Sequence, residues 1–242
     1  MKSLLIAFNL MTTIPLPTSK DWQGGDIGRA SVWYPIVGLV IGGLTWLAWT
    51  GATRLFPSLV AGILTLIVWV ALTGGLHLDG LTDCCDGLLA STSVERRLEI
   101  MKDPRLGAFG GIGLILVLLL KAAILAALTP ETSLGILLAA SLARWCILPA
   151  ALLPLARTSG MGADFVAGFR RSFIFIGAVL PFGIALALGT RGILSLLAGA
   201  LAAALVLHLA KSRIGGVTGD VFGMVVEIVE VVSLLAFVTR NV

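Results

Sequence analysis

The stretch AFGGIGLILVLLLKAAILAAL, residues 108–128, decides the fold class of this chain. Lys121 is its only charged residue, and a helix needs about 20 mainly apolar residues to cross the hydrocarbon core of a bilayer. Comparable apolar runs recur along the chain, separated by short charged or Gly- and Pro-rich stretches. The sequence therefore predicts seven membrane-spanning helices, at about 31–51, 57–76, 108–128, 133–153, 173–189, 192–210 and 220–238.

The composition supports the same fold class. Of the 242 residues, 58% are hydrophobic and 12% are charged, whereas a soluble domain is usually near half apolar and a quarter charged. These values exclude a soluble globular fold, and they exclude a disordered chain, which needs polar and charged sequence. We predict an all-α, polytopic integral membrane bundle of about seven transmembrane helices plus an N-terminal interfacial segment, forming one membrane-embedded domain over 1–242.

The N-terminal 17 residues and the basic residues predict the orientation. MKSLLIAFNLMTTIPLP begins with Lys2 and an apolar stretch but lacks a small-x-small cleavage signal, so we expect a retained interfacial or half-inserted helix. Lys and Arg are enriched in the cytoplasmic loops of membrane proteins. We therefore interpret the net charge of +4 as a sign of membrane topology, and we expect no nucleic-acid partner. The basic residues of the predicted cytoplasmic side are Lys2, Lys20, Arg29, Arg96, Arg97, Lys102, Arg105, Arg157, Arg170, Arg171, Lys211 and Arg213, against Arg54, Arg191 and Arg240 on the other side.

Three carboxylates share one helix face in the longest polar stretch, 74–111. Asp79, Asp83 and Asp86 are spaced i, i+4 and i+7, which places them within about 60° of one another at the cytoplasmic end of the second span. Like charges stacked in this way repel, and near a membrane they are poorly solvated. We expect a compensating cation, and Mg²⁺ is the natural choice because it is a hard ion that prefers oxygen ligands. The alternative is a solvated acidic helix cap.

A second polar group follows the carboxylates. Lys102, Asp103 and Arg105 precede a glycine-rich turn, GAFGGIG at 107–113, and cations beside backbone amides at a helix start predict a phosphate cradle. A metal beside such a cradle is suited to binding a diphosphate. Glycines in membrane helices also serve close packing, which is the structural alternative. His77 points away from the face of the carboxylates, and it is a candidate phosphate ligand or acid–base group, or an interfacial helix residue.

Further charged residues enter the last predicted span. Asp220 opens this span, and it is a candidate general base or a further metal ligand. Glu227 and Glu230 lie deeper, where ionisable groups face a polar interior or a partner. Pairing of these two acids with Lys121 or Arg144 is one interpretation, and a functional role is the other.

Three motifs in order resemble one known family. They are GGLHLDGLTDCCDGL (74–88), EIMKDPRLGAFG (99–110) and GGVTGDVFG (215–223), and they are similar to motifs of the adenosylcobinamide-GDP ribazoletransferases, also called cobalamin (5′-phosphate) synthases. The resemblance runs from Ile14 in the N-terminal segment to the final span. No departure from the family pattern removes a carboxylate, although Thr13 stands where a basic residue is common. The other departures are Thr82, Cys84, Cys85 and Pro104.

The resemblance implies a Mg²⁺-dependent enzyme of the bacterial cytoplasmic (inner) membrane, with its active site facing the cytoplasm. Members of the family join adenosylcobinamide-GDP to α-ribazole or α-ribazole 5′-phosphate and release GMP, late in vitamin B12 assembly. The preferred acceptor, the number of Mg²⁺ ions and the oligomeric state, a homo-oligomer included, stay open. The expected site residues are Asp79, Asp83 and Asp86 for the metal, Asp83 and Asp220 for catalysis, and His77, Lys102, Asp103 and Arg105 for the diphosphate.

Two rival functions use similar residues. A CDP-alcohol-type membrane phosphotransferase also carries Asp residues on facing helices, but its signature contains DG-x₂-AR, and residues 79–83 lack the AR pair. An ion-coupled transporter would use Asp220, Glu227 and Arg144 as a charge relay. Most acids of this chain lie instead at one predicted membrane surface, which disfavours transport.

Overall fold

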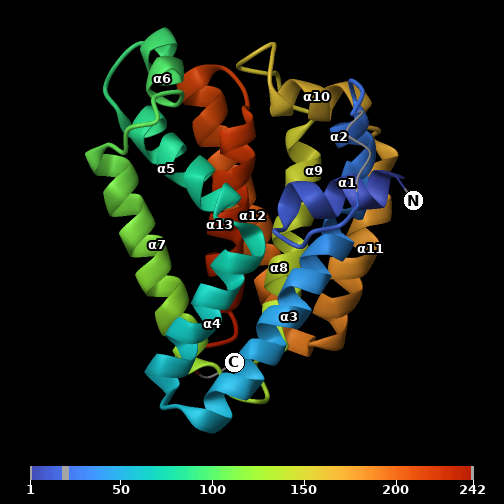
Figure 1. The fold of residues 1–242 in the computed structure, drawn as a ribbon, viewed down its shortest axis with the longest axis vertical. Helices are drawn as coiled ribbons and strands as arrows, with labels where there is room; N and C mark the ends of the chain where they lie inside the picture. The colour runs from blue at the N-terminus through green and yellow to red at the C-terminus, as the bar shows by residue number, and fades with distance from the viewer. Residues whose placement is uncertain (1, 18–21, 241–242) are drawn as a thin grey trace.

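The chain folds into an elongated bundle of helices (Figure 1). The computed structural model describes residues 2–17 and 22–240, and no β-strand is formed within these two ranges. Successive long helices run in alternate directions between the two ends of the bundle. The helices are α1 (Lys2–Met11), α2 (Asp26–Ala30), the short 3₁₀ helix η1 (Ser31–Trp33), α3 (Tyr34–Leu55), α4 (Ser58–Thr73), α5 (Leu76–Leu89), α6 (Val94–Ile100), α7 (Ala108–Ala127), α8 (Gly135–Trp145), α9 (Ile147–Ala150), α10 (Met161–Gly168), α11 (Ser172–Ala187), α12 (Gly189–Ile214) and α13 (Gly219–Leu235).

Helical structure lies at all seven predicted spans, in α3, α4, α7, α8 with α9, α11, α12 and α13. Three helices are long and apolar enough to cross a membrane alone: α2 with α3 as one helix (Asp26–Leu55), α7 and α12. The number rises to five if each of two bent pairs, α4 with α5 and α10 with α11, is one span. The all-α membrane bundle is confirmed, and seven crossings stay a prediction.

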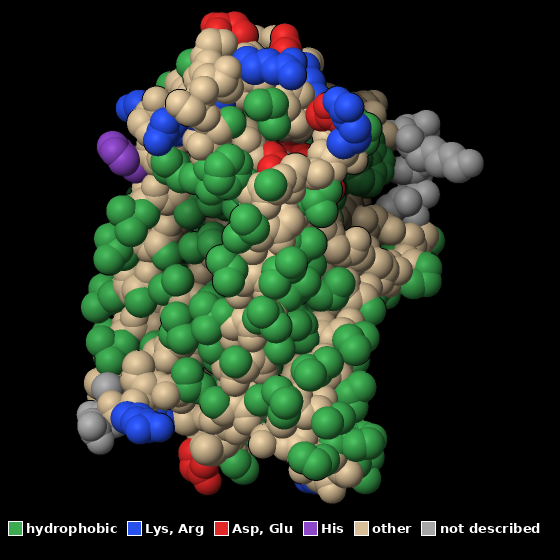
Figure 2. Space-filling view, turned by 90° about the vertical axis from the view of Figure 1, so that its left-hand side faces the viewer, with side chains coloured by type: hydrophobic (Ala, Val, Ile, Leu, Met, Phe, Trp, Pro, Cys, Tyr) green, Lys and Arg blue, Asp and Glu red, His purple; other side chains and the backbone are tan. Residues whose placement is uncertain are grey.

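Charge and apolar surface are separated along the long axis. Figure 2 shows most of the Lys, Arg, Asp and Glu side chains of this face at one end of the molecule, above a broad hydrophobic band, with a few at the opposite end. The loops at this end flank α6, α10 and the start of α13, and the opposite end holds the α3–α4 connection and the C-terminus. This separation is what a bilayer requires, because polar groups are poorly solvated in hydrocarbon. Lys20, predicted for the basic side, lies outside the described residues.

The second predicted span ends earlier than expected. α4 stops at Thr73, and the chain bends by 92° into α5. Gly74 and Gly75 make the bend, with φ of 64° and 72°, a left-handed conformation that glycine adopts without a Cβ penalty. The three carboxylates of the first motif therefore lie on a separate helix, α5, and not at the end of α4.

The N-terminal segment folds as a helix, α1, and is fixed to α4 by Thr13. The Thr13 amide donates to the Leu72 carbonyl at 2.8 Å, and its hydroxyl donates to the Ala71 carbonyl at 2.8 Å. These bonds satisfy carbonyls at the end of α4, where no intrahelical donor remains. Thr13 thus has a structural role at the position where the family pattern commonly has a basic residue.

Four buried charges join α7, α8 and α13. Lys121 Nζ donates to Glu227 Oε2 at 3.0 Å and also pairs with Glu230, which in turn pairs with Arg144. The four side chains are at most 4% exposed, and Lys121 Nζ lies 4.4 Å from the ring centroid of Trp69 on α4. The predicted pairing of these acids with Lys121 and Arg144 is confirmed. We call these four residues the buried ion network.

Candidate functional site

The polar end of the bundle brings Asp79 and Asp83 on α5 close to Asp220 at the start of α13. Two glycines allow the two helices to approach: a Cβ on Gly80 would lie 2.7 Å from the Asp220 carbonyl oxygen, and one on Gly223 would lie 3.0 Å from the carbonyl oxygen of His77. Any larger side chain at either position would push the helices apart. The crossing thus unites two motifs whose first residues, Gly74 and Gly215, are 141 positions apart in the chain.

The carboxylates at this crossing are short of partners. Asp79 is exposed and Asp83 is half-buried, and within the described ranges neither side chain has a hydrogen bond or an ion pair. Asp83 lies in the field of the Asp79, Asp86 and Asp220 carboxylates and of one guanidinium, Arg157. We call Asp79, Asp83 and Asp220 the acidic site.

Arg157 is a site residue that the sequence analysis did not single out. Its Nη1 donates to Asp220 Oδ2 at 3.1 Å, and its Nη2 donates to the Leu98 carbonyl at 2.9 Å, so it links α6 to α13. A short backbone pairing places it there, since the Ala156 amide donates to the Val217 carbonyl at 2.9 Å. The sequence offered only the count of basic residues on one side, which gives no hint of this partner.

Asp86 caps the start of α7. One of its oxygens accepts from the Gly107 amide and the other from the Gly110 amide, both at 2.8 Å. A negative group is favourable at a helix N-terminus, where the first amides lack partners. The expectation that these amides are open to a phosphate is therefore wrong, because Asp86 occupies two of them. Its predicted role as a metal ligand stays a prediction.

The α6–α7 loop holds Lys102, Asp103 and Arg105, which are three of the four predicted diphosphate ligands. Arg105 Nε and Nη2 form a forked pair with the two oxygens of Asp103, at 2.9 and 2.5 Å. These bonds lower the pKa of Asp103 to about 2 and leave Arg105 partly engaged. Lys102 is exposed, and its ammonium has no ion pair to any described residue. Lys102 is thus the cation of this loop that is most available to a ligand.

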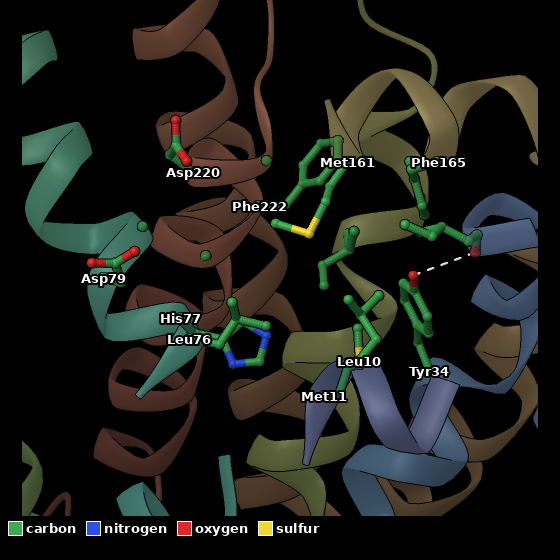
Figure 3. A pocket seen from close by; sticks show the side chains of 15 residues that line it. Leu10, Met11, Tyr34, Leu76, His77, Asp79, Met161, Phe165, Asp220 and Phe222 are labelled. Atoms are coloured by element: carbon green, nitrogen blue, oxygen red, sulfur yellow. Dashed lines mark hydrogen bonds between the residues drawn. The ribbon is translucent and has the colours of Figure 1, made fainter. Parts of the chain in front are cut away.

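His77 lies in the wall of a pocket and not on the surface. It is 4% exposed, and the pocket has a volume of about 100 Å³ and also reaches Asp79 and Asp220. Figure 3 shows the two carboxylates at one end of the pocket, on facing helices, with the imidazole ring below them. The prediction that His77 faces away from the carboxylates holds for its position on α5, but tertiary packing leaves it beside the same site.

The donor set of the acidic site suits a hard divalent cation. Within the described ranges no three acidic, His or Cys side chains converge tightly enough to enclose a metal ion. Mg²⁺ does not need such an enclosure, because it is commonly bound by one or two carboxylates together with waters and substrate phosphates. Asp79 and Asp83 offer unpaired carboxylate oxygens of this kind, and they fit the ion.

Comparisons with known proteins identify the family. The chain matches the family described as Cobalamin-5-phosphate synthase over residues 3–238. It is 37% identical to an adenosylcobinamide-GDP ribazoletransferase of Desulfitobacterium hafniense (strain Y51), over 97% of this chain and 96% of the relative. It is 40% identical to one of Pseudomonas aeruginosa (strain PAO1), over 98% and 97% of the two chains. No solved structure matches the chain. With its three motifs in place and nearly its whole length matched, the chain belongs to the cobalamin-5-phosphate synthase family.

Proposed function

We propose that this chain is a Mg²⁺-dependent membrane transferase that joins adenosylcobinamide-GDP to α-ribazole or α-ribazole 5′-phosphate and releases GMP. The family and the names of the relatives support this substrate pair. Neither rival function has comparable support, since Glu227 and Arg144, two residues of the hypothetical transport relay, belong to the buried ion network. We also propose that the polar end faces the cytoplasm of a bacterial inner membrane, because the basic residues gather there.

One observation carries the proposal: the acidic site has more negative than positive charge. Three carboxylates meet one guanidinium, that of Arg157. Such an excess of negative charge at a half-buried crossing is unfavourable unless a cation binds. A reaction on a diphosphate needs a cation at the same place, since negative charge on the phosphate oxygens must be neutralised.

Asp79 and Asp83 are the proposed ligands of Mg²⁺. When bound, Mg²⁺ supplies positive charge that stabilises the phosphate oxygens during transfer. Asp86 keeps α7 in place beside these ligands through its bonds to Gly107 and Gly110. Lys102, at the start of the neighbouring loop, provides a mobile ammonium for the diphosphate.

Asp220 is the proposed acceptor of the proton. Its Oδ2 is bonded to Arg157 and Thr218, which holds the carboxylate in place and leaves Oδ1 for the ribose 3′-hydroxyl of α-ribazole. The oxygen of this ribose 3′-hydroxyl attacks the phosphorus that bears the cobinamide, and the hydroxyl proton passes to Asp220 Oδ1. GMP leaves with the electrons of the broken P–O bond. Alignment by a fixed carboxylate is how an enzyme lowers the entropic part of such a barrier.

The test is a two-substrate assay with the full chain in lipid nanodiscs. GMP release should require adenosylcobinamide-GDP, α-ribazole and Mg²⁺ together. Asp83→Asn should reduce turnover by about 10²- to 10³-fold, as loss of one electrostatic stabiliser commonly does. Glu99→Gln, in an exposed pair of α6, is the control and should keep full turnover. Near wild-type turnover of Asp83→Asn at limiting Mg²⁺ would refute the metal assignment.

A further inference from the structure

The pocket beside the acidic site is walled by helices from distant parts of the chain. Leu10 and Met11 of α1, Tyr34 of α3, Phe165 of α10 and Phe222 of α13 all face it (Figure 3). Asp79 and Asp220 stand at one end, and the rest of the lining is mainly apolar. A ligand that fills this pocket would thus place a polar group at the carboxylates and an apolar group among the rings.

Aromatic rings and thioethers dominate the apolar part. The ring centroids of Phe165 and Phe222 are 5.0 Å apart, and those of Phe165 and Tyr34 are 6.0 Å apart with the planes nearly parallel. Met11 and Met161 also line the pocket, together with the aliphatic side chains of Leu10, Ile27, Leu76 and Ile147, and thioether sulfur makes favourable contacts with aromatic rings. Surfaces of this kind favour a flat, apolar aromatic guest.

His77 adds one polar group to the wall. Its Nδ1 is buried and has no hydrogen-bond partner among the described residues. A buried polar atom without a partner is unfavourable by about 1–3 kcal/mol, so it points to a bound group. The imidazole can form a hydrogen bond with one ring nitrogen of a ligand, as the donor or as the acceptor according to its tautomer.

These features select among the three ring systems of the proposed reaction. A volume of about 100 Å³ is far too small for a corrin ring. A flat bicyclic base enters it only in part, since cavities of about 150 Å³ hold a single benzene ring, and the rest of the base then lies in the open side of the pocket. Guanine carries an amino group and a ring N–H, whose side-chain acceptors in this pocket would be Asp79 and Asp220, the carboxylates that the proposed reaction already assigns to Mg²⁺ and to the proton of the ribose hydroxyl. The dimethylbenzimidazole of α-ribazole has two methyl groups and a single free ring nitrogen, which matches an apolar wall with one imidazole.

We propose that this pocket binds the benzimidazole base of the acceptor, with Phe165 and Phe222 against its ring face and its ribose directed to Asp79 and Asp220. The inference rests on the proposed function, since it assigns one of that reaction's two substrates to one place. It also assigns binding roles to α1 and α10, which lie outside the three sequence motifs.

The first experiment fills the pocket from its open side. Met161 is 53% exposed, so Met161→Trp adds bulk without removing a buried core residue. We expect the KM for α-ribazole to rise at least tenfold, while the KM for adenosylcobinamide-GDP changes less than twofold. Leu152→Trp is the matched control, because Leu152 is also 53% exposed and is not part of the lining, and it should change neither constant. The proposal is overturned if only the KM for adenosylcobinamide-GDP increases, or if neither KM increases.

The second experiment uses the unmodified chain and does not depend on turnover. Equilibrium dialysis should give tighter binding of 5,6-dimethylbenzimidazole than of benzimidazole, by about fourfold for each buried methyl group, and Met161→Trp should abolish the difference. Equal affinity for the two bases contradicts an apolar pocket. If the bases bind as expected but GMP release fails, the proposed function is wrong and the base site remains.

Discussion

The acidic site and the buried ion network are both built on α13, and they differ in charge balance. In the network, Glu227 and Glu230 are matched by Lys121 and Arg144. At the acidic site, Asp220 stands with Asp79 and Asp83 against Arg157 alone. Removing one member of a paired buried set leaves an uncompensated charge, which is strongly destabilising, whereas a surplus of like charge in a cleft marks a candidate functional site. The contrast separates structure from function along one helix.

The largest expected effect comes from a substitution that breaks the buried ion network. Glu230→Gln leaves Arg144 and Lys121 without their shared carboxylate, and uncompensated buried charge lowers the free energy of unfolding by about 3–5 kcal/mol. Chemical denaturation in mild detergent measures the change. Glu99→Gln, whose pair with Arg96 is exposed, should lower it by less than about 1 kcal/mol. Equal losses in the two variants would show that burial does not distinguish these pairs.

The opposite change in stability is expected at the acidic site. Asp83→Asn removes one of several like charges. Without Mg²⁺, the free energy of unfolding should therefore stay unchanged or increase by up to about 1 kcal/mol. The turnover of this variant should fall all the same. Chemical denaturation in mild detergent measures the free energy of unfolding, and a clear loss of stability would mean that the Asp83 carboxylate is already compensated in the folded chain.

Asp86 should act as a structural cap. Asp86→Ala removes both bonds to the start of α7, and loss of a helix cap lowers the free energy of unfolding by about 1 kcal/mol. Asp103→Ala, at an exposed ion pair of the adjacent loop, should change it by less than about 0.5 kcal/mol. Asp86→Asn, which retains an acceptor oxygen, should recover part of the loss, and failure to do so would argue against capping.

Arg157 should reduce the attraction of the site for cations. Arg157→Met removes the guanidinium beside Asp220, and in water a unit positive charge repels a divalent cation by about 1 kcal/mol at a distance of about 8 Å. The Mg²⁺ concentration for half-maximal GMP release should therefore fall about fivefold, whereas Arg96→Met should not alter it. An unchanged Mg²⁺ requirement would place the metal away from Asp220.

The smallest effect concerns pH. Arg105 lowers the pKa of Asp103 to about 2, below the usual value of about 3.9. The pair is therefore complete above the usual value and is lost as the pH falls through about 2, so it should not respond between pH 5 and 8. The carboxyl ¹³C shift of Asp103 measures this, and Arg105→Gln should move the midpoint up towards the usual value.

Periodicity and composition predicted much of this architecture. The apolar runs gave the positions of the helices, because a span needs a fixed apolar length. The same reasoning placed Asp79, Asp83 and Asp86 on one helix, and it gave pairing with Lys121 or Arg144 as one of two interpretations of Glu227 and Glu230, since unpaired charge in an apolar interior is unfavourable. These features depend on spacing within short segments or on a simple need for charge balance, and both can be read along the chain.

Other features were decided by tertiary structure alone. The 92° bend at Gly74 and Gly75 turned α5 out of the line of α4, and the crossing with α13 then brought Asp220 to the carboxylates. Asp86 met the amides of α7, and Arg157 met Asp220, through contacts between segments that are remote in sequence. Local pattern determines which residue types share a helix face, but the angle and depth of each helix crossing determine which faces meet, and only the packed bundle sets those.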